Sequence, residues 1–198
     1  MNILELARHE KNLVVGLRRY FHENPELSQK EFKTMDFIEK KLNGWGIETV
    51  RIPHGGIFGV LDSGKPGWTM LMRADIDALP IDEDSCNLKG KKICVSKNAG
   101  VMHACGHDVH TSVMLGAALL LKQQETTLPG RVRILFQPAE ESFGGAKTLI
   151  RAGALQNVAA IFGMHNEPGL PVGEFATRGG AFYANVDRFV LRINGKGA

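Results

Sequence analysis

The sequence predicts an α/β fold in which helices cover a central mixed sheet. Short apolar runs with glycine and proline around them have the length and the surroundings of strands. These runs occupy residues 57–61, 69–72, 132–136 and 159–164. Helical stretches at about 108–124 and 145–153 lie between them. Because strands that alternate with helices assemble into one sheet with helices on its faces, this order predicts an α/β sandwich.

Two helices are expected before the first strand. Apolar side chains within residues 3–23 fall on one stripe, which predicts an amphipathic helix that ends near Pro25. Ser28 and Glu31 have the spacing of a capping box, in which each side chain satisfies a free amide at the start of a helix. The second helix is therefore expected to begin there and to end at residues 44–46.

The last part of the chain changes character. Residues 172–178 and 189–193 have the composition of strands, and a new element begins near Ala184 with little sequence left to complete it. We therefore expect a first domain over residues 1–183 and the start of a second, incomplete domain over residues 184–198.

Composition excludes several classes of protein. Apolar residues make up 43% of the 198 residues and charged residues 23%, as in ordinary globular proteins. A net charge of +3, without a run of Lys or Arg, argues against a nucleic-acid partner. We expect no secretory leader and no membrane span of ~20 apolar residues. The three cysteines have no disulfide spacing, which favours a cytoplasmic location.

One segment is dense in residues that bind metal. Residues 101–110 contain His103, Cys105, His107, Asp108 and His110. Imidazole and thiolate are good ligands for zinc and related metals, and Gly106 lets the backbone turn so that Cys105 and His107 face one centre. A helix that starts near Asp108 would favour the thiolate form of Cys105. In an alternative interpretation, the histidines cap this helix and Cys105 is a buried packing residue.

Two acids follow the apolar run at 132–136. Glu140 and Glu141 come after Pro138, at a strand end, where loops held by a rigid scaffold collect ligands and catalytic groups. Adjacent carboxylates are commonly a solvated pair, but the apolar strand and Pro138 argue against casual exposure. Two neighbouring acids can also have different roles, since one can bind metal while the other serves as a general base.

Further candidates follow two other strands. Asp75 and Asp77 come after the run at 69–72, where an acid can orient a ligating histidine, although a lone Asp-x-Asp is common in turns. His165 follows the run at 159–164 and is a further candidate ligand, although a single histidine there is more often a core or surface residue. Several strand ends with metal or acid–base chemistry are hard to explain by chance.

With these residues assembled, the chain resembles the M20 family of metallopeptidases and amidohydrolases over nearly its whole length. The closer match is the aminoacylase-like subgroup, which includes hippurate hydrolases, indole-3-acetyl-amino-acid hydrolases and N-acetyldiaminopimelate deacetylases. The matching motifs are His22-x-x-Pro25-Glu26-Leu27-Ser28, Arg73-Ala74-Asp75-Ile76-Asp77-Ala78-Leu79-Pro80, Met102-His103-Ala104-Cys105-Gly106-His107-Asp108, Phe136-Gln137-Pro138-Ala139-Glu140-Glu141, Gly144-Gly145-Ala146, Met164-His165 and Gly195-Lys196-Gly197.

This resemblance implies a zinc-peptidase-like catalytic domain that binds two divalent metal ions, whether zinc, manganese, nickel or cobalt. By motif position, the implied metal ligands are Cys105, His107, Glu141 and His165. The implied general base is Glu140, and Asp77 is the acid that supports the site. The implied reaction is hydrolysis of the amide bond of N-acyl amino acids, which releases a carboxylic acid and a free amino acid.

Members of the family continue through a small α/β lid that mediates homodimerisation, and they then return to complete the catalytic domain. The resemblance therefore implies that residues 184–198 begin this lid. It also implies that the last metal ligand, a histidine, and the residues that hold the substrate carboxylate lie outside the chain. Two alternatives stay open: a dipeptidase or carboxypeptidase with the same metal chemistry, and an inactive fragment that only binds metal. The expected partner is a small N-acyl amino acid or peptide.

Overall fold

The computed structural model describes residues 2–53, 55–142, 144–184, 186–187 and 189–196. The chain divides into two compact units, Met1–Asn166 and Glu167–Ala198. All helices and strands of the described residues lie in the first unit. The expected domain boundary between residues 183 and 184 remains a prediction. Gly197 of the last motif and the final residue Ala198 lie outside the described residues.

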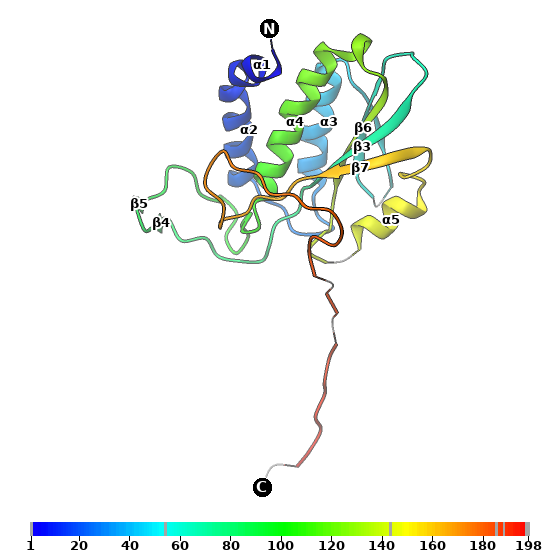
Figure 1. The fold of residues 1–198 in the computed structure, drawn as a ribbon. Helices are drawn as coiled ribbons and strands as arrows, with labels where there is room; N and C mark the ends of the chain where they lie inside the picture. Colours follow the sequence, from blue (N-terminus) through cyan, green and yellow to red (C-terminus); the bar gives the residue numbers. More distant parts are fainter. Residues whose placement is uncertain (1, 54, 143, 185, 188, 197–198) are drawn as a thin grey trace. The chain divides into compact units, whose positions relative to one another are not determined.

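Five strands form one mixed sheet (Figure 1). In spatial order they are β1 (Glu48–Arg51), β2 (Ile57–Asp62), β6 (Gly130–Gln137), β3 (Trp68–Asp75) and β7 (Val158–Gly163). β2 pairs antiparallel with β1 and β6, whereas β3 pairs parallel with β6 and β7. The carboxyl ends of β3, β6 and β7 therefore meet at one edge of the sheet. A separate small hairpin consists of β4 (Cys86–Asn87) and β5 (Gly90–Lys91).

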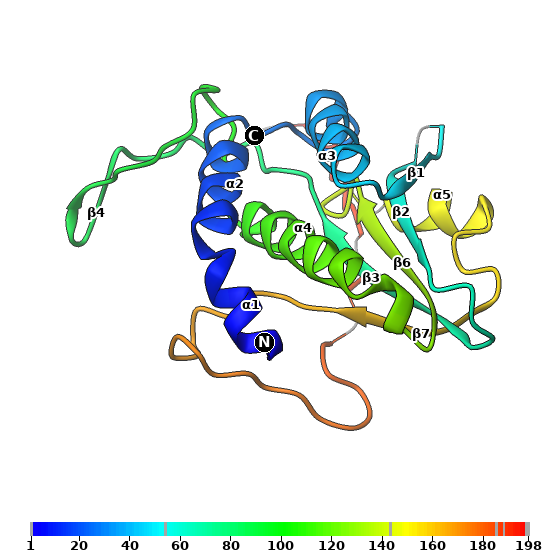
Figure 2. The same cartoon turned by 90° about the horizontal axis from the view of Figure 1, so that it is seen from above.

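Helices cover both faces of the sheet (Figures 1 and 2). They are α1 (Ile3–His9), α2 (Lys11–Glu23), α3 (Phe32–Gly44), α4 (His107–Gln123) and α5 (Gly145–Arg151), with a 3-10 turn, η1, at Glu125–Thr127. α4 lies between α2 and α3 and packs on β3, while α5 packs on the other face against β6. The predicted α/β sandwich is confirmed. Among the described residues, no helix combines the length and the apolar character needed to cross a bilayer.

The alternation of side chains along the strands creates two apolar clusters, one on each face. Ile134 and Phe136 of β6 belong to the larger cluster, which α2, α3 and α4 cover. Leu135 belongs to the smaller cluster with Leu149 of α5. Full burial of such a side chain contributes about 1.5–3 kcal/mol, so the end of β6 that leads to the two acids is firmly held.

The predicted capping box at Ser28 and Glu31 does not form. α3 begins at Phe32, with Glu31 as its N-cap and no capping hydrogen bond from a side chain. The Ser28 hydroxyl instead donates to Asp77, and the Glu31 carboxylate accepts the N–H of Ala139. The two side chains therefore bind the loops after β3 and β6, which the local spacing could not indicate.

Other local predictions also differ from the structure. The long helix expected over residues 3–23 is interrupted at Glu10, because α1 ends at His9 and α2 begins at Lys11. Residues 172–178 and 189–193 form no strand. A strand needs a neighbour that pairs with its N–H and C=O groups, and none of the described residues pairs with these two segments. The sequence pattern missed β1, which is short and mostly exposed.

Candidate metal centre

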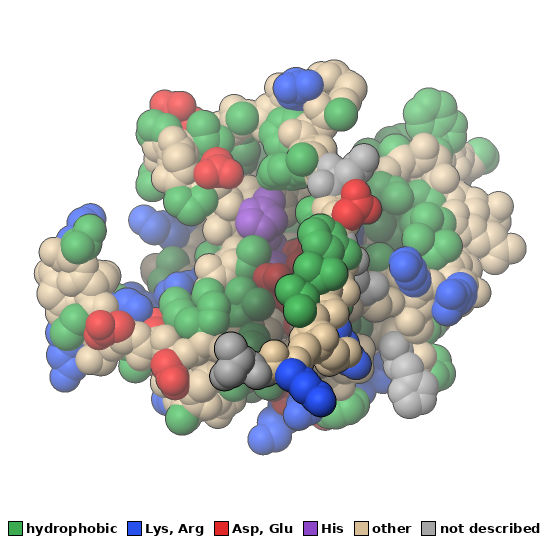
Figure 3. Space-filling model, turned by 90° about the horizontal axis from the view of Figure 1, so that it is seen from below, with side chains coloured by type: hydrophobic (Ala, Val, Ile, Leu, Met, Phe, Trp, Pro, Cys, Tyr) green, Lys and Arg blue, Asp and Glu red, His purple; other side chains and the backbone are tan. Residues whose placement is uncertain are grey.

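The candidate residues gather where the parallel strands end. Asp75 ends β3 and Asp77 lies just beyond it, while Glu140 and Glu141 follow β6. His165 follows β7, and His107 is the first residue of α4. In the view from below, histidine and acidic side chains show next to one another near the middle of the surface (Figure 3). The site therefore combines four segments that are far apart in the sequence.

His107 lies at the centre of this group and is 1% exposed. Its Nδ1 donates to the carbonyl of Asp77 over 2.8 Å and lies 3.3 Å from that residue's Oδ1. This bond leaves Nε2 as the free nitrogen, 3.7 Å from Oδ2 of Asp75 and 3.8 Å from Oε1 of Glu141. Burial lowers the pKa of His107, but the carboxylates of Asp77, Asp75 and Glu141 outweigh burial and raise it above its usual value.

Asp77 connects three parts of the site. Its Oδ2 accepts the Ser28 hydroxyl over 2.6 Å and the backbone N–H of Glu141 over 3.0 Å. Burial raises the pKa of Asp77, but the hydrogen bonds from His107, Ser28 and Glu141 outweigh it and hold the pKa below its usual value. The ionised carboxylate is thus placed to orient His107 and to fix the start of Glu141.

The turn after β6 has a constrained backbone. Ala139 has a φ of +53°, in the left-handed region that favours glycine, and its N–H donates over 2.8 Å to the buried carboxylate of Glu31. A Cβ at Gly145 would collide with the carbonyl of Pro138, so the chain after the turn can approach only as glycine. Such backbone strain persists where the surroundings hold it in place. The turn therefore sets the direction in which Glu140 and Glu141 project.

Cys105 and His165 face each other, with Sγ 3.4 Å from Nε2. His165 donates through Nδ1 to the carbonyl of Asn166 over 2.7 Å, which leaves Nε2 toward the sulfur. Gly106 precedes α4 with a φ of +87°, and a Cβ there would lie 2.6 Å from Nδ2 of Asn166. The positive φ would strain any other residue here, and its Cβ would press on the side chain of Asn166, so the position favours glycine between Cys105 and His107.

The negative charges shift the ionisation of neighbouring groups. Burial, together with the charges of Glu141 and Asp75, raises the pKa of Glu140 above its usual value. Burial, Glu141 and Glu140 raise the pKa of the Cys105 thiol to about 12. The expectation that the start of α4 favours the thiolate is therefore wrong for the metal-free protein, because burial and the carboxylates outweigh the helix terminus. A divalent cation would offset this concentration of negative charge.

Two further residues lie beside these groups: His110, which the sequence indicated only as a supporting residue of the segment 101–110, and Asn166, which it did not indicate. His110 is fully buried, and its Nδ1 lies 2.7 Å from Oδ1 of Asp75. The backbone N–H of Asn166 donates to Nε2 of His110 over 3.1 Å. The three-residue spacing between His107 and His110, which places both on one helix face, was the available sequence feature. No sequence feature pointed to Asn166.

A second buried network holds the beginning of α4. Oδ2 of Asp108 lies 2.8 Å from Nδ1 of His22 and 3.0 Å from Nε of Arg18. His22 also contacts Glu83, with Nε2 3.0 Å from Oε1. Burial raises the pKa of Asp108, but His22 and Arg18 outweigh it and hold the pKa below its usual value. This network ties α2 and the segment after β3 to the residue that follows His107.

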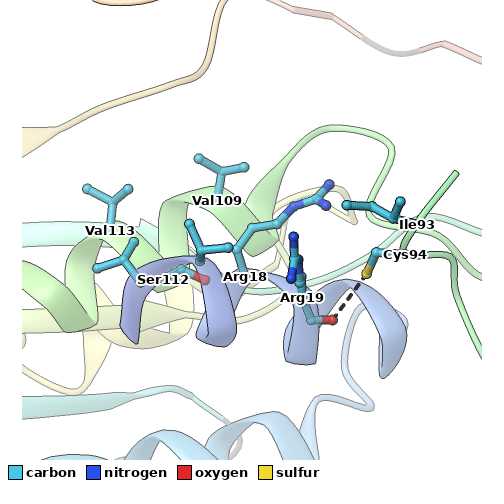
Figure 4. A pocket seen from close by; sticks show the side chains of 9 residues that line it. Arg18, Arg19, Ile93, Cys94, Val109, Ser112 and Val113 are labelled. Atoms are coloured by element: carbon cyan, nitrogen blue, oxygen red, sulfur yellow. Dashed lines mark hydrogen bonds between the residues drawn. The ribbon is translucent and has the colours of Figure 1, made fainter. Parts of the chain in front are cut away.

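A cavity of about 340 Å³ lies between α2 and α4 (Figure 4). Its walls are mainly apolar, with Val15, Ile93 and Val113 among them, and Arg18 and Arg19 also line it. Its lining includes neither the candidate ligands nor the acids at the strand ends. The cavity is therefore distinct from the candidate metal centre.

The donor atoms at the strand ends fit divalent cations. Among the residues that the structure describes, three sets of side chains offer donor atoms within 4.8 Å of one another: Cys105 with His107 and His165, Asp75 with His107 and His110, and His107 with Glu140 and Glu141. Nε2 of His107 and Oε1 of Glu141 are buried without a hydrogen-bond partner among the described residues. Buried polar atoms without a partner are costly, and a bound cation would satisfy both. The sulfur and imidazole donors suit zinc and similar transition metals.

The chain is similar in sequence to known hydrolases. Residues 71–189 match the sequence model of peptidase family M20/M25/M40. The chain is 44% identical over 198 residues to the N-acetyl-L-cysteine deacetylase of Bacillus subtilis (strain 168). The aligned region covers 100% of this chain and 46% of that protein. It is 41% identical over 206 residues to thermostable carboxypeptidase 2 of Saccharolobus solfataricus, and this aligned region covers 100% of this chain and 51% of that protein.

The fold is also similar to that of a solved structure. The crystal structure of the Bacillus subtilis YXEP protein, described as a dinuclear metal binding peptidase from the M20 family, superposes with a TM-score of 0.77 at 44% sequence identity. The match covers 84% of this chain and 46% of that chain. The chain thus spans about half the length of the curated relatives that it matches.

Proposed function

The chain belongs to peptidase family M20/M25/M40, and on that premise we propose that its protein hydrolyses the amide bond of N-acyl amino acids with the help of divalent metal ions. The products are a carboxylic acid and a free amino acid. The similarity to a deacetylase that acts on N-acetyl-L-cysteine supports this substrate class.

The observation that carries this proposal is the position of His107. One ring nitrogen is held by Asp77, and the other is buried and free. This free nitrogen lies 3.8 Å from Oε1 of Glu141, and a ring nitrogen of His107 lies within 4.8 Å of donor atoms of Cys105 and His165 and of Glu140 and Glu141. A buried imidazole oriented by an acid, with its second nitrogen among further donors, is the usual arrangement of a metal-ligating histidine.

Two divalent ions are the proposed cofactors, and the proposed ligands are Cys105, His107, Glu141 and His165. The similarity to a dinuclear metal binding peptidase supports the number of ions. Their identity could be zinc, manganese, nickel or cobalt, since the donor set mixes sulfur, nitrogen and oxygen. When bound, such ions acidify water and polarise a carbonyl.

Glu140 is the proposed general base. Its raised pKa suits proton transfer near neutral pH better than that of an ordinary exposed carboxylate. Glu140 accepts a proton from the attacking water and then delivers it to the leaving amine, so that the carboxylate is regenerated at the end of the cycle. Asp77 does not touch the substrate in this scheme, because it holds His107 and Glu141 in place.

A second candidate function is that of a carboxypeptidase or dipeptidase with the same site. The similarity to thermostable carboxypeptidase 2 favours this second function. Hydrolysis of a peptide and of an N-acyl amino acid breaks the same kind of amide bond, and the two substrates differ only in the acyl group. Homodimerisation through a lid domain and a cytoplasmic location are further proposals for the whole protein.

The test compares hydrolysis of N-acetyl amino acids with hydrolysis of dipeptides by the metal-loaded whole protein. We expect a higher kcat/KM on N-acetyl amino acids. Turnover of dipeptides alone would reject the aminoacylase activity in favour of the peptidase. The same assay on the 198-residue chain tests the alternative of an inactive fragment that only binds metal. Binding of metal without turnover would support that alternative for this part of the protein.

A further inference from the structure

His110 is fully buried on α4, and both of its ring nitrogens are hydrogen-bonded. Nε2 receives the backbone N–H of Asn166. Because an amide N–H can only donate, Nε2 must be the unprotonated nitrogen. The proton therefore lies on Nδ1, which donates to Oδ1 of Asp75 over 2.7 Å. The main chain and one carboxylate thus fix the tautomer and the ring plane of His110.

Asp75 is itself held firmly at the end of β3. It is 2% exposed, and its second oxygen lies 3.1 Å from Nη2 of Arg73. Nε of Arg73 donates to Oε1 of Gln137 at the end of β6 over 2.9 Å. Burial raises the pKa of Asp75, but His110, His107 and Arg73 outweigh it and hold the pKa well below its usual value. His110 is therefore held by β3 through Asp75 and, through Arg73, by β6.

The backbone of Asn166 connects His110 with His165 through two hydrogen bonds. Its N–H is held by His110, and its carbonyl accepts the Nδ1 proton of His165. His165 is exposed, and most of β7 before it is exposed as well, so packing alone holds this ligand weakly. The two hydrogen bonds of one backbone residue thus determine which nitrogen of His165 faces Cys105.

We propose that His110 is a positioning residue that, through the backbone of Asn166, presents Nε2 of His165 to the metal centre. The proposal rests on the proposed metal-dependent function. It gives a role to a buried histidine whose two ring nitrogens are already hydrogen-bonded and which is not among the four proposed ligands. Partners of this kind that orient a ligating histidine typically change metal affinity by about 10–100-fold when they are removed.

The first test measures binding of Co²⁺ to the metal-free whole protein by calorimetry and by the absorption of the bound ion. We expect His110→Phe, which removes both hydrogen bonds, to weaken binding of the ion by about tenfold or more. His110→Gln should restore much of the affinity, because its amide oxygen can accept the N–H of Asn166. Thermal unfolding of each metal-free variant shows whether the loss arises from the fold instead.

Two control variants show whether the effect acts through the hydrogen bonds that connect His110 with His165 or through a general loss of stability. Ser112→Ala removes a buried hydrogen bond on the same helix, from the Ser112 hydroxyl to the carbonyl of Asp108, and should leave Co²⁺ affinity nearly unchanged. Asn166→Ala keeps both backbone hydrogen bonds and should lose less affinity than His110→Phe. A folded His110→Phe variant that binds Co²⁺ as tightly as the unaltered protein would overturn the proposal. An equal loss in Asn166→Ala would also overturn it, in favour of the Asn166 side chain.

A second measurement needs no variant. Two-bond ¹H–¹⁵N correlation spectra of the unaltered metal-free protein report the tautomer of each histidine. We expect the proton of His110 on Nδ1 and that of His165 on Nδ1 as well. A proton on Nε2 of His110 would refute the proposal even if His110→Phe does not fold. An unaltered protein that binds no divalent ion at all would instead reject the proposed function, so the two failures are distinguishable.

Discussion

The hydroxyl of Ser28 donates a 2.6 Å hydrogen bond to Oδ2 of Asp77, although 49 residues separate the two in the chain. Asp77 in turn holds His107 through its carbonyl and Glu141 through its carboxylate. The segment before α3 therefore takes part in building the candidate metal centre, and its contribution can be measured.

Ser28→Ala should weaken metal binding by about tenfold, because a hydrogen bond to a buried charged group contributes about 1.5–3 kcal/mol. Isothermal titration of the metal-free protein with Zn²⁺ measures the effect. Ser28→Thr is the matched control, since it keeps the hydroxyl and should stay close to the unaltered protein. Equal affinities for all three proteins would show that Ser28 does not support Asp77.

Glu140→Gln should keep the metal and lose most of the activity. The substitution removes the proton carrier but no proposed ligand, and loss of general-base catalysis typically lowers the rate by about 10²–10⁴-fold. Metal analysis and kcat on an N-acetyl amino acid measure the two effects. Glu141→Gln is the contrasting variant and should lose metal as well as activity. Loss of metal from Glu140→Gln would make Glu140 a ligand.

Cys105→Ala should lower metal occupancy, because it removes the sulfur donor that faces His165. Elemental analysis of the purified variant after dialysis gives the occupancy. Cys86→Ala is the control, since Cys86 is a free, exposed cysteine on β4. Occupancy that is unchanged in Cys105→Ala would remove this cysteine from the proposed cluster.

Gly106→Ala should destabilise the metal-free protein by more than about 1 kcal/mol, since φ is +87° and the new Cβ would press on the amide of Asn166. Gly16→Ala, in the interior of α2, is the matched control. A Cβ there meets nothing within 4 Å, so the change should stabilise the protein by about 0.5–1 kcal/mol. Urea unfolding at constant pH measures both. Equal effects would contradict the close approach at Gly106.

The ion pair of His22 and Asp108 predicts a pH dependence of stability. The hydrogen bond with Asp108 raises the pKa of His22, burial lowers it, and Glu83 adds to the increase, so the folded-state pKa lies above the usual value. A raised histidine pKa stabilises the folded state fully below the unfolded pKa of about 6.5, and the contribution is lost as pH rises through the folded pKa.

Urea unfolding of the unaltered protein and of His22→Gln, each from pH 5.5 to 9, tests this dependence. The difference in the free energy of unfolding between the two proteins should be largest near pH 5.5 and should shrink as pH rises. A difference that stays constant over this range would show that His22 does not gain protons on folding.

Local sequence patterns predicted much of the fold and of the candidate site. The apolar runs identified β2, β3, β6 and β7, since burial of a strand requires a continuous or alternating apolar sequence. The donors at the ends of these strands pointed to one edge of a sheet, because parallel strands end together. Gly106 was also readable from the sequence, since few other residues allow such a turn between two ligands.

Only the tertiary structure decided which residues support these donors. The spacing of Ser28 and Glu31 matched a helix cap, yet both side chains bind loops of distant strands. The contact of His110 with Asn166 exists because β7 lies next to β3, against which α4 packs. Sequence patterns report periodicity and local backbone preference. They do not report which distant segments become neighbours, because strand order and helix packing depend on the energy of the whole fold.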